Sequence, residues 1–161
     1  MEYQSFNTSI EVTKPADEVF SAIKEIPKWW NSEDFEGSCA KLNDEFIIHH
    51  PGQHYSKQRV IEDNPFTRIV WLVTESELFW LKKNRQEWTN TKMIFDIATQ
   101  NDKTNLHFTH HGLTPDKECY RLCEMGWTMI IKEFLFHLII FGASSADLSK
   151  AAEIRNRSLE K

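Results

Sequence analysis

The amino-acid sequence predicts an α+β fold in which a strongly curved antiparallel sheet of about seven strands wraps round a long C-terminal helix and encloses an apolar cavity. Three patterns predict it: an alternating strand near the N-terminus, a run of short strands joined by turn signals, and a long apolar helix near the C-terminus. The chain has 161 residues and is 40% apolar, which suffices for one core. We expect one domain over residues 1–142 and a helical or flexible tail over residues 143–161.

The first strand is predicted over residues 3–12, where apolar and polar residues alternate as they do on a half-buried strand. Pro15 then favours the first turn of a helix, and acidic residues follow it where the helix dipole favours anions. We expect Pro27 to end this helix. Trp29 and Trp30 follow in a short linker.

The middle of the chain predicts a meander, because Asn, Asp, Pro and Gly pairs recur between short apolar stretches. Connections this short force neighbouring strands to be antiparallel. Residues 76–86 fit either an extended hairpin or a mobile flap. The expected strands span residues 35–41, 45–50, 55–62, 68–75, 87–100 and 104–112.

A long helix is predicted from Thr114, a good N-cap followed by Pro115, to about Phe141, with Gly142 as its end. A stripe at helical spacing is expected to face the concave side of the sheet. Additional apolar residues outside the stripe suggest that the tail or a second subunit covers the outer face. The stripe comprises Trp127, Ile130, Ile131, Phe134, Leu138 and Phe141, and the residues outside it are Phe136 and Ile140.

Composition excludes several classes of partner. The chain has 19 basic and 24 acidic residues, a formal charge of -5 and no basic cluster, so nucleic acid is not an expected partner. Residues 129–141 form the longest apolar run, but charged residues interrupt it and it is too short to cross a bilayer. The N-terminus has no pattern of an export signal, so we expect a cytoplasmic protein that does not insert into membranes.

Specific motifs resemble a known family. These are residues 14–20 after the first strand, the Trp29-Trp30 pair, residues 60–65, residues 104–113 and the Gly126-Trp127 step. Together with the order of elements, they resemble the activator-of-heat-shock-ATPase-homologue-like branch of the START-like (SRPBCC) superfamily over residues 3–141. The chain departs from the family pattern at Glu45-Phe46, where a glycine pair often stands, and in a long insertion over residues 76–88.

This resemblance implies a helix-grip fold like that of the birch pollen allergen, with a cavity between sheet and helix. In relatives the cavity holds lipids, sterols, polyketides or other apolar molecules. The family takes its name from a co-chaperone that stimulates the ATPase of a heat-shock chaperone.

Residues for the cavity follow from strand alternation and from the aromatic excess of six Trp and eleven Phe. Each residue individually would also fit a closed core, and only their number favours a pocket. The expected ligand-binding residues are Trp29, Trp30, Phe46, Ile48, His50, Trp71, Val73, Phe79, Trp80, Met93, Phe95, Phe108, His110, Trp127, Ile131 and Phe134.

Seven histidines include the adjacent pairs 49–50 and 110–111. Adjacent strand residues point to opposite faces, so His50 and His110 are the expected inward members. They would bind a polar ligand group or carry a proton, or they would be hydrogen-bonded within the fold and serve no chemistry. Cys119 and Cys123 are spaced by one helical turn without a second ligand pair, so we expect free thiols and no metal.

The sequence therefore favours non-catalytic binding of a small apolar or aromatic molecule, without a cofactor. It contains no Gly-rich phosphate loop, nucleophile elbow or zinc-protease motif. One alternative is an enzyme of the cyclase, dehydratase or hydrolase type that uses a cavity His or Glu as acid or base. Another, from the resemblance alone, is a modulator of a heat-shock chaperone ATPase. A homodimer is compatible with each.

Overall fold

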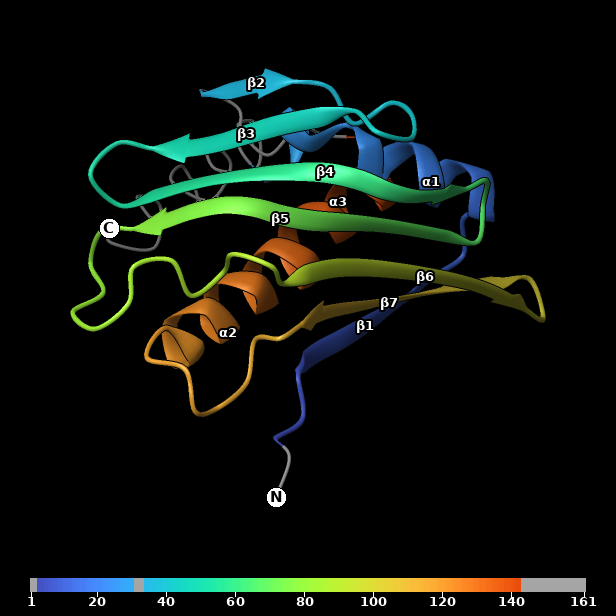
Figure 1. The fold of residues 1–161 in the computed structure, drawn as a ribbon. Helices are drawn as coiled ribbons and strands as arrows, with labels where there is room; N and C mark the ends of the chain where they lie inside the picture. The colour runs from blue at the N-terminus through green and yellow to red at the C-terminus, as the bar shows by residue number, and fades with distance from the viewer. Residues whose placement is uncertain (1–2, 31–33, 143–161) are drawn as a thin grey trace, which may run out of the picture.

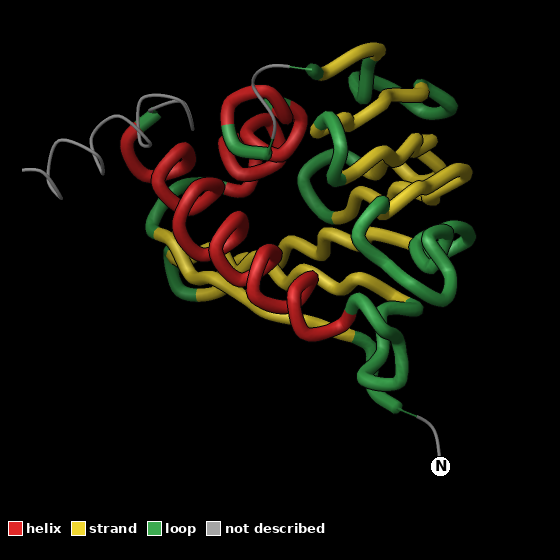
Figure 2. The backbone as a smooth tube through the Cα atoms, turned by 90° about the vertical axis from the view of Figure 1, so that its left-hand side faces the viewer, coloured by secondary structure: helices red, strands yellow, loops and turns green. Residues whose placement is uncertain are grey.

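A computed structural model of the chain describes residues 3–30 and 34–142. Seven antiparallel strands form one sheet in the order β1-β7-β6-β5-β4-β3-β2, and the helices lie on one side of it (Figures 1 and 2). This confirms the predicted α+β class, the meander and the long C-terminal helix. The expected tail, residues 143–161, lies outside the described residues. The strands are β1 Phe6–Val12, β2 Phe35–Gly37, β3 Glu45–His50, β4 His54–Asn64, β5 Arg68–Leu78, β6 Lys92–Gln100 and β7 Lys103–His111.

The first helix, α1, spans Ala16–Lys24 and ends before the expected stop at Pro27. Pro27 instead lies within a 3₁₀ turn, Ile26–Lys28. Proline disfavours helical backbone at the residue before it and lacks the amide hydrogen that a helix needs, so α1 cannot continue through it. The turn places Trp29 in the core and Trp30 at its edge.

Several strand boundaries differ from the sequence prediction, and within the meander the three largest differences are in β2, β5 and β6. β2 ends at Gly37, four residues early, where the backbone turns into a positive-φ conformation (φ +99°). β5 continues to Leu78, so the beginning of the ambiguous 76–86 segment extends a strand. β6 begins at Lys92, not at residue 87, because residues 87–90 form turns and Asn90 has a φ of 72°. The alternation of polar and apolar residues gives no signal for where the backbone leaves a strand, so these boundaries could not be placed from it.

The long helix begins at Tyr120 and not at Thr114. Residues 115–119 form turns, and the Thr114 hydroxyl donates a hydrogen bond to the Asp116 carboxylate. The helix runs as α2, Tyr120–Met129, through a π-helical segment, Ile130–Leu135, into α3, Phe136–Phe141. Gly142 ends it in the left-handed conformation (φ 71°), as predicted.

The buried stripe of this helix differs from the expected one in its second half. Leu135 is fully buried, whereas Phe141 is 69% exposed. Buried residues recur every four positions at Cys123, Trp127, Ile131, Leu135 and Ile139. In a regular α-helix each four-residue step would turn the stripe by about 40°. The π-helical segment has a wider turn and keeps the side chains in line. Phe136 and Ile140, expected on the outer face, are partly buried against the core.

The sheet bends sharply along β4, whose pairing with β5 shifts register at 57/58 and again at 60/62. Such bulges increase local twist and curvature. β5 pairs with β6 only from Arg68 to Leu72, and beyond this point the two strands separate. The loop of residues 79–91 occupies the gap, with Val73 bonded to the backbone of Asn90 and Thr91. One end of the sheet is therefore open between β5 and β6.

The centre of the sheet, by contrast, is filled by aromatic rings. The Trp71 ring lies 4.9 Å from Phe46, 4.8 Å from Phe95 and 6.4 Å from Trp29, and all four side chains are at most 1% exposed. Phe108 continues this packing to Trp127, at 4.6 Å between ring centroids. The middle of the domain is a close-packed core.

Candidate ligand pocket

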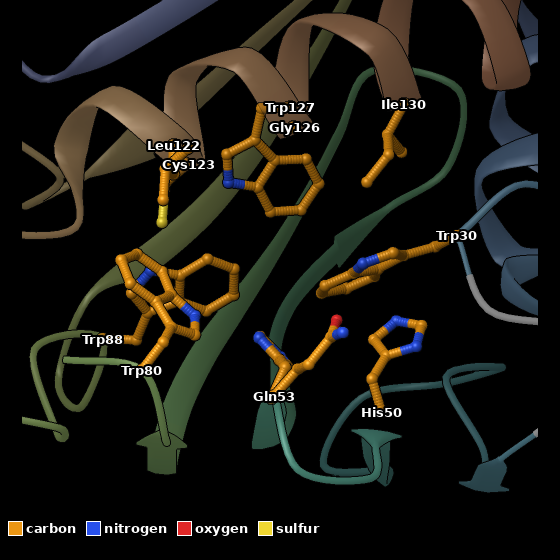
Figure 3. Close-up of a pocket in the computed structure, with 11 residues that line it drawn as sticks. Trp30, His50, Gln53, Trp80, Trp88, Leu122, Cys123, Gly126, Trp127 and Ile130 are labelled. Carbon is orange, nitrogen blue, oxygen red and sulfur yellow. The ribbon is translucent and has the colours of Figure 1, made fainter.

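A pocket of about 460 Å³ lies at the open end of the sheet (Figure 3). Its volume is within the range of about 300–1,000 Å³ that is usual for small-molecule sites. The remaining hollows described here, such as the one between α1 and α3, are lined largely by charged and polar side chains. The lining residues are Trp30, His50, Gln53, His54, Trp80, Trp88, Leu122, Cys123, Gly126, Trp127 and Ile130.

Four parts of the chain build the pocket, and one of them is Trp30, which follows the 3₁₀ turn after α1. The long helix supplies one wall, from Leu122 to Ile130, and the loop after β5 supplies Trp80 and Trp88. The β3–β4 hairpin supplies the polar side chains, and Figure 3 shows His50 and Gln53 across the pocket from the helix. The pocket thus has mostly apolar walls and one polar edge.

Four indole rings line the pocket, and most of them also contact the core. Trp30 lies 5.0 Å from Trp127 and stacks on the core ring of Trp71 at 6.3 Å. Trp88 stacks nearly parallel to Trp127, at 5.9 Å and 12°. These rings are held in place before any ligand arrives. Trp80 is 39% exposed and lies at the mouth.

Two carboxylates fasten the loop to the start of the long helix. Glu118 accepts hydrogen bonds from the backbone amides of Lys82 and Lys83, at 3.0 Å each for its nearer oxygen. Glu87, in the loop, accepts from the amides of Glu118 and Cys119, at 3.1 and 2.9 Å. The amides before a helix have no partner within the helix, so Glu87 takes the place of the missing cap. This double clamp, Glu87 with Glu118, positions Trp80 and Trp88.

His110, from β7, is fully buried behind the pocket and has a protein partner for each ring nitrogen. The Trp127 indole N–H donates to His110 Nδ1 at 3.0 Å, and Nε2 lies 2.8 Å from Thr91 Oγ1. Because Nδ1 accepts, the proton of the neutral ring is assigned to Nε2, which donates to Thr91. Thr91 in turn donates to the carbonyl of Trp88 at 2.5 Å. Burial lowers the pKa of His110 to about 3, so the ring stays neutral near pH 7.

His54, the first residue of β4, lines the pocket itself. Its Nε2 lies 2.7 Å from the Ser56 hydroxyl, and its ring meets Trp88 edge-on at 4.8 Å. Burial, with smaller contributions from His50 and His49, lowers the pKa of His54 to about 3. His54 is therefore a neutral, oriented imidazole at the polar edge.

Solved structures with the same architecture identify the fold. An Aha1 dimer from Colwellia psychrerythraea matches with a TM-score of 0.65 at 17% identity, over 84% of this chain and 96% of that chain. The chain has the helix-grip fold. CalU16 from Micromonospora echinospora shares it, with a TM-score of 0.60 at 17% identity over 96% of this chain and 84% of that one. DynU16, from the dynemicin biosynthetic locus, matches with a TM-score of 0.66 at 12% identity, over 89% of this chain and half of its own length.

These likenesses confirm, at the level of fold, the resemblance to START-like proteins that the sequence motifs indicate. No protein-family profile matches the chain, and no curated protein matches it by sequence. At such low identities the matches show a shared helix-grip fold and do not show a shared function, because one fold can host many functions.

The helix-grip pocket contains some of the expected ligand-binding residues and leaves others in the core. Trp30, His50, Trp80 and Trp127 line it. Phe79 is 36% exposed beside it, and Phe134 is partly buried against the core. His50 lies at the exposed rim while His110 is buried, so the two histidines expected to face one site are in different environments. The fully enclosed ones are Trp29, Phe46, Ile48, Trp71, Val73, Met93, Phe95, Phe108, His110 and Ile131.

Sequence reasoning did not select Gln53, His54, Trp88, Leu122, Cys123, Gly126 or Ile130, all of which line the pocket. Ile130 had a signal, since it belongs to the expected helix stripe. Trp88 had a weaker one, as a large aromatic residue in a segment assigned to a strand. His54 and its strand neighbours had none, because residues 54–59 are polar on both faces of β4 and alternation cannot tell which face is inside.

The remaining groups near the pocket offer little further chemistry. Cys123 lines the pocket and Cys119 is buried beside it, both as free thiols. The hydrogen bond to Cys123, together with burial, raises the pKa of Cys119, so this thiol stays protonated. Among the described residues, no group of three or more His, Cys, Asp or Glu is placed to hold a metal ion. Within the same residues, no helix is long and apolar enough to cross a membrane.

Proposed function

We propose that this protein binds a small apolar or aromatic molecule in the pocket at the open end of its sheet and does so without catalysing a reaction. The observation that carries the proposal is the lining itself: four indole rings with Leu122 and Ile130, around about 460 Å³ of space. Aromatic and aliphatic walls with a few polar groups are typical of ligand sites. The interior below the pocket is filled, so a bound molecule would remain at this end.

The histidines support binding over acid–base catalysis. His110 has both ring nitrogens engaged by Trp127 and Thr91 and does not line the pocket. His54 has a pKa of about 3, far below the operating pH at which a general base is most effective. His50 lies at the exposed rim. His110 therefore lacks access to the pocket, and His54 lacks a pKa near neutrality.

The test is calorimetric titration of the purified chain with a library of small aromatic and aliphatic molecules, with native mass spectrometry of protein isolated from its host. We expect a bound apolar molecule of one mass, and heats of binding with a negative heat-capacity change. Absence of binding across the library, together with a chain that carries no bound mass, would sink the proposal.

Two adjacent aromatic residues offer a matched pair of variants. Trp80 lines the pocket and Phe79 does not, and their exposed fractions are similar, 39% and 36%. Trp80→Ala should weaken binding about tenfold or more, since it removes one wall of the pocket. Phe79→Ala should leave affinity unchanged. Equal effects of both variants would argue against this pocket as the site.

A homodimer is part of the proposal. Leu122, Met125 and Met129 follow helical spacing on α2 and are 58%, 60% and 47% exposed. An apolar ridge of this kind suits a second copy of the chain. Sedimentation velocity should show a dimer that Met125→Glu converts to a monomer, and a wild-type monomer at all accessible concentrations would exclude it.

A further inference from the structure

One strand carries a line of polar side chains from the pocket into the core. His54, Ser56 and Gln58 occupy alternate positions of β4, and Ser56 and Gln58 are both fully buried. Gln58 Nε2 donates to Ser56 Oγ at 2.5 Å, and Ser56 Oγ lies 2.7 Å from His54 Nε2. Buried polar groups are expensive unless they are bonded, so this line calls for an explanation beyond packing.

The line determines which nitrogen of His54 carries the proton. Ser56 has one hydroxyl proton and two side-chain partners among the described residues: the Gln58 amide nitrogen, which can only donate, and His54 Nε2, which can accept. The hydroxyl proton is therefore directed at His54 Nε2. An accepting Nε2 leaves the proton of the neutral ring on Nδ1. The structure gives Nδ1 no protein partner among the described residues, and His54 lines the pocket. His54 therefore offers an N–H donor to whatever occupies the pocket.

The orientation of the Gln58 amide decides this assignment. As placed, it leaves Gln58 Oε1 without a partner among the described residues. The opposite orientation would satisfy that oxygen but leave both N–H groups of the amide unpaired, whereas as placed one of them is bonded to Ser56. It would also reverse the chain, so that Nε2 donates and Nδ1 accepts. An under-satisfied carbonyl is the more common compromise in folded proteins.

The rest of the lining favours an uncharged ligand. None of the eleven lining residues is Lys, Arg, Asp or Glu, so an ionic ligand would leave water without a counter-charge. His54 does not supply one, because burial keeps its ring neutral. The four indole rings suit a flat aromatic body.

We propose that the pocket selects a neutral, flat aromatic molecule bearing a hydrogen-bond acceptor such as a carbonyl group, and that the Nδ1–H of His54 donates to that acceptor. Ser56 is the positioning residue that holds His54 in the donating tautomer, and Gln58 orients Ser56. This inference rests on the proposed binding function and specifies its ligand class.

The test uses probes that share one ring system and differ in a single group: 2-acetylnaphthalene, 2-ethylnaphthalene, 2-naphthoate and a trimethylammonium-naphthalene salt. Calorimetry at pH 7.5 should give a dissociation constant for the acetyl compound about threefold to tenfold lower than for the ethyl compound, the effect of one neutral hydrogen bond. Both ionic probes should bind more weakly than the ethyl compound.

Variants locate the donor. His54→Phe keeps a ring in place and should bring the ratio of the two neutral probes close to one, whereas His111→Phe, which lies outside the lining, should preserve it. Ser56→Ala should reduce the ratio without touching the lining. If His54→Phe does not fold, the nitrogen NMR spectrum of the wild-type imidazoles gives the tautomer directly, and a proton on Nε2 of His54 would overturn the inference.

The outcomes separate this inference from the proposed function. If both neutral probes bind equally well, or if either ionic probe binds most tightly, the selection rule is wrong while the pocket still binds. If none of the four probes binds and the library also fails, the binding function itself is wrong.

Discussion

The filled centre of the sheet and its open end use the same kinds of residue to opposite effect. At the centre, Trp29 and Trp71 contact one another and neighbouring rings and are fully buried. At the open end, Trp127 contacts Trp30 and stacks on Trp88, and all three rings also line a hollow. The difference is the covering: β5 and β6 stay paired over the centre and separate at the end.

The two histidines in contact with Trp88 show the same contrast. His110 has both nitrogens bonded within the protein, whereas His54 has one nitrogen bonded to Ser56 and lines the pocket. Trp88 lies between them, with its ring 4.8 Å from each. A closed hydrogen-bond network stabilises the fold, and a network with one free group is suited to recognition.

The largest expected effect is on the filled centre. Trp71→Ala should lower the free energy of unfolding by about 3–5 kcal/mol, because it leaves a cavity among rings that cannot collapse into it. Urea denaturation measures the loss, and Trp80→Ala at the mouth should lose less than about 1 kcal/mol. A small loss at Trp71 would mean that the centre is loosely packed and that the contrast with the open end is false.

Acid should destabilise the fold through the two histidines. Each has a folded-state pKa of about 3, below its unfolded value of 6.5, so the unfolded chain binds more protons between these values. Stability is fully present above pH 6.5 and falls as the pH decreases towards 3. At about pH 5.5, protonation of both rings in the unfolded chain should lower the free energy of unfolding by about 2–3 kcal/mol.

His110→Phe should be less stable than wild type at pH 8, because the Trp127 N–H and the Thr91 hydroxyl lose their partner, and its loss between pH 8 and 5.5 should be about half as large. His111→Gln, at an exposed neighbouring position, should keep the full pH dependence. Stability that is flat from pH 8 to 5.5 in wild type would show that neither ring is buried in its neutral form.

Substitution of Glu87 in the double clamp tests whether the clamp holds the loop of residues 79–91 against the long helix. Glu87→Gln should cost about 1 kcal/mol of unfolding free energy, since it weakens two bonds at the helix start and removes a charge favoured there. Hydrogen exchange of the Cys119 backbone amide should be faster in this variant than in the wild type. Glu77→Gln, which disrupts only a 3.9 Å surface pair with Arg85, is the control and should change neither. No change in exchange at Cys119 would exclude the clamp.

The smallest expected effect is that of a substitution at Gly126, which should raise the stability of the fold and lower the affinity for the ligand. Gly126 lies in α2 and lines the pocket, and a Cβ added there would meet no atom within 4 Å. Gly126→Ala should therefore stabilise the helix by about 0.5–1 kcal/mol while narrowing the pocket and weakening binding. Thermal denaturation and calorimetry on one preparation measure both. Tighter binding by this variant would contradict the position of the pocket.

The class of fold and the order of its elements can be predicted from the amino-acid sequence alone. Alternation, turn pairs and the apolar C-terminal segment are local signals, and each is read from neighbouring residues. β3 has the predicted bounds, and the helix ends at Gly142 as expected. The periodicity of an ideal helix misplaced the second half of the buried stripe, because the π-helical segment leaves no mark on spacing that a 3.6-residue rule detects.

The boundary between the filled core and the pocket cannot be predicted from the sequence, because it arises from contacts in the folded chain. That boundary depends on β5 separating from β6 and on a loop held to α2 by Glu87 and Glu118, which lie 31 residues apart in the chain. Packing in the folded chain also turns one polar face of β4 inward, the face that carries His54, Ser56 and Gln58. Contacts between distant segments set both features, and no local pattern of polarity encodes them.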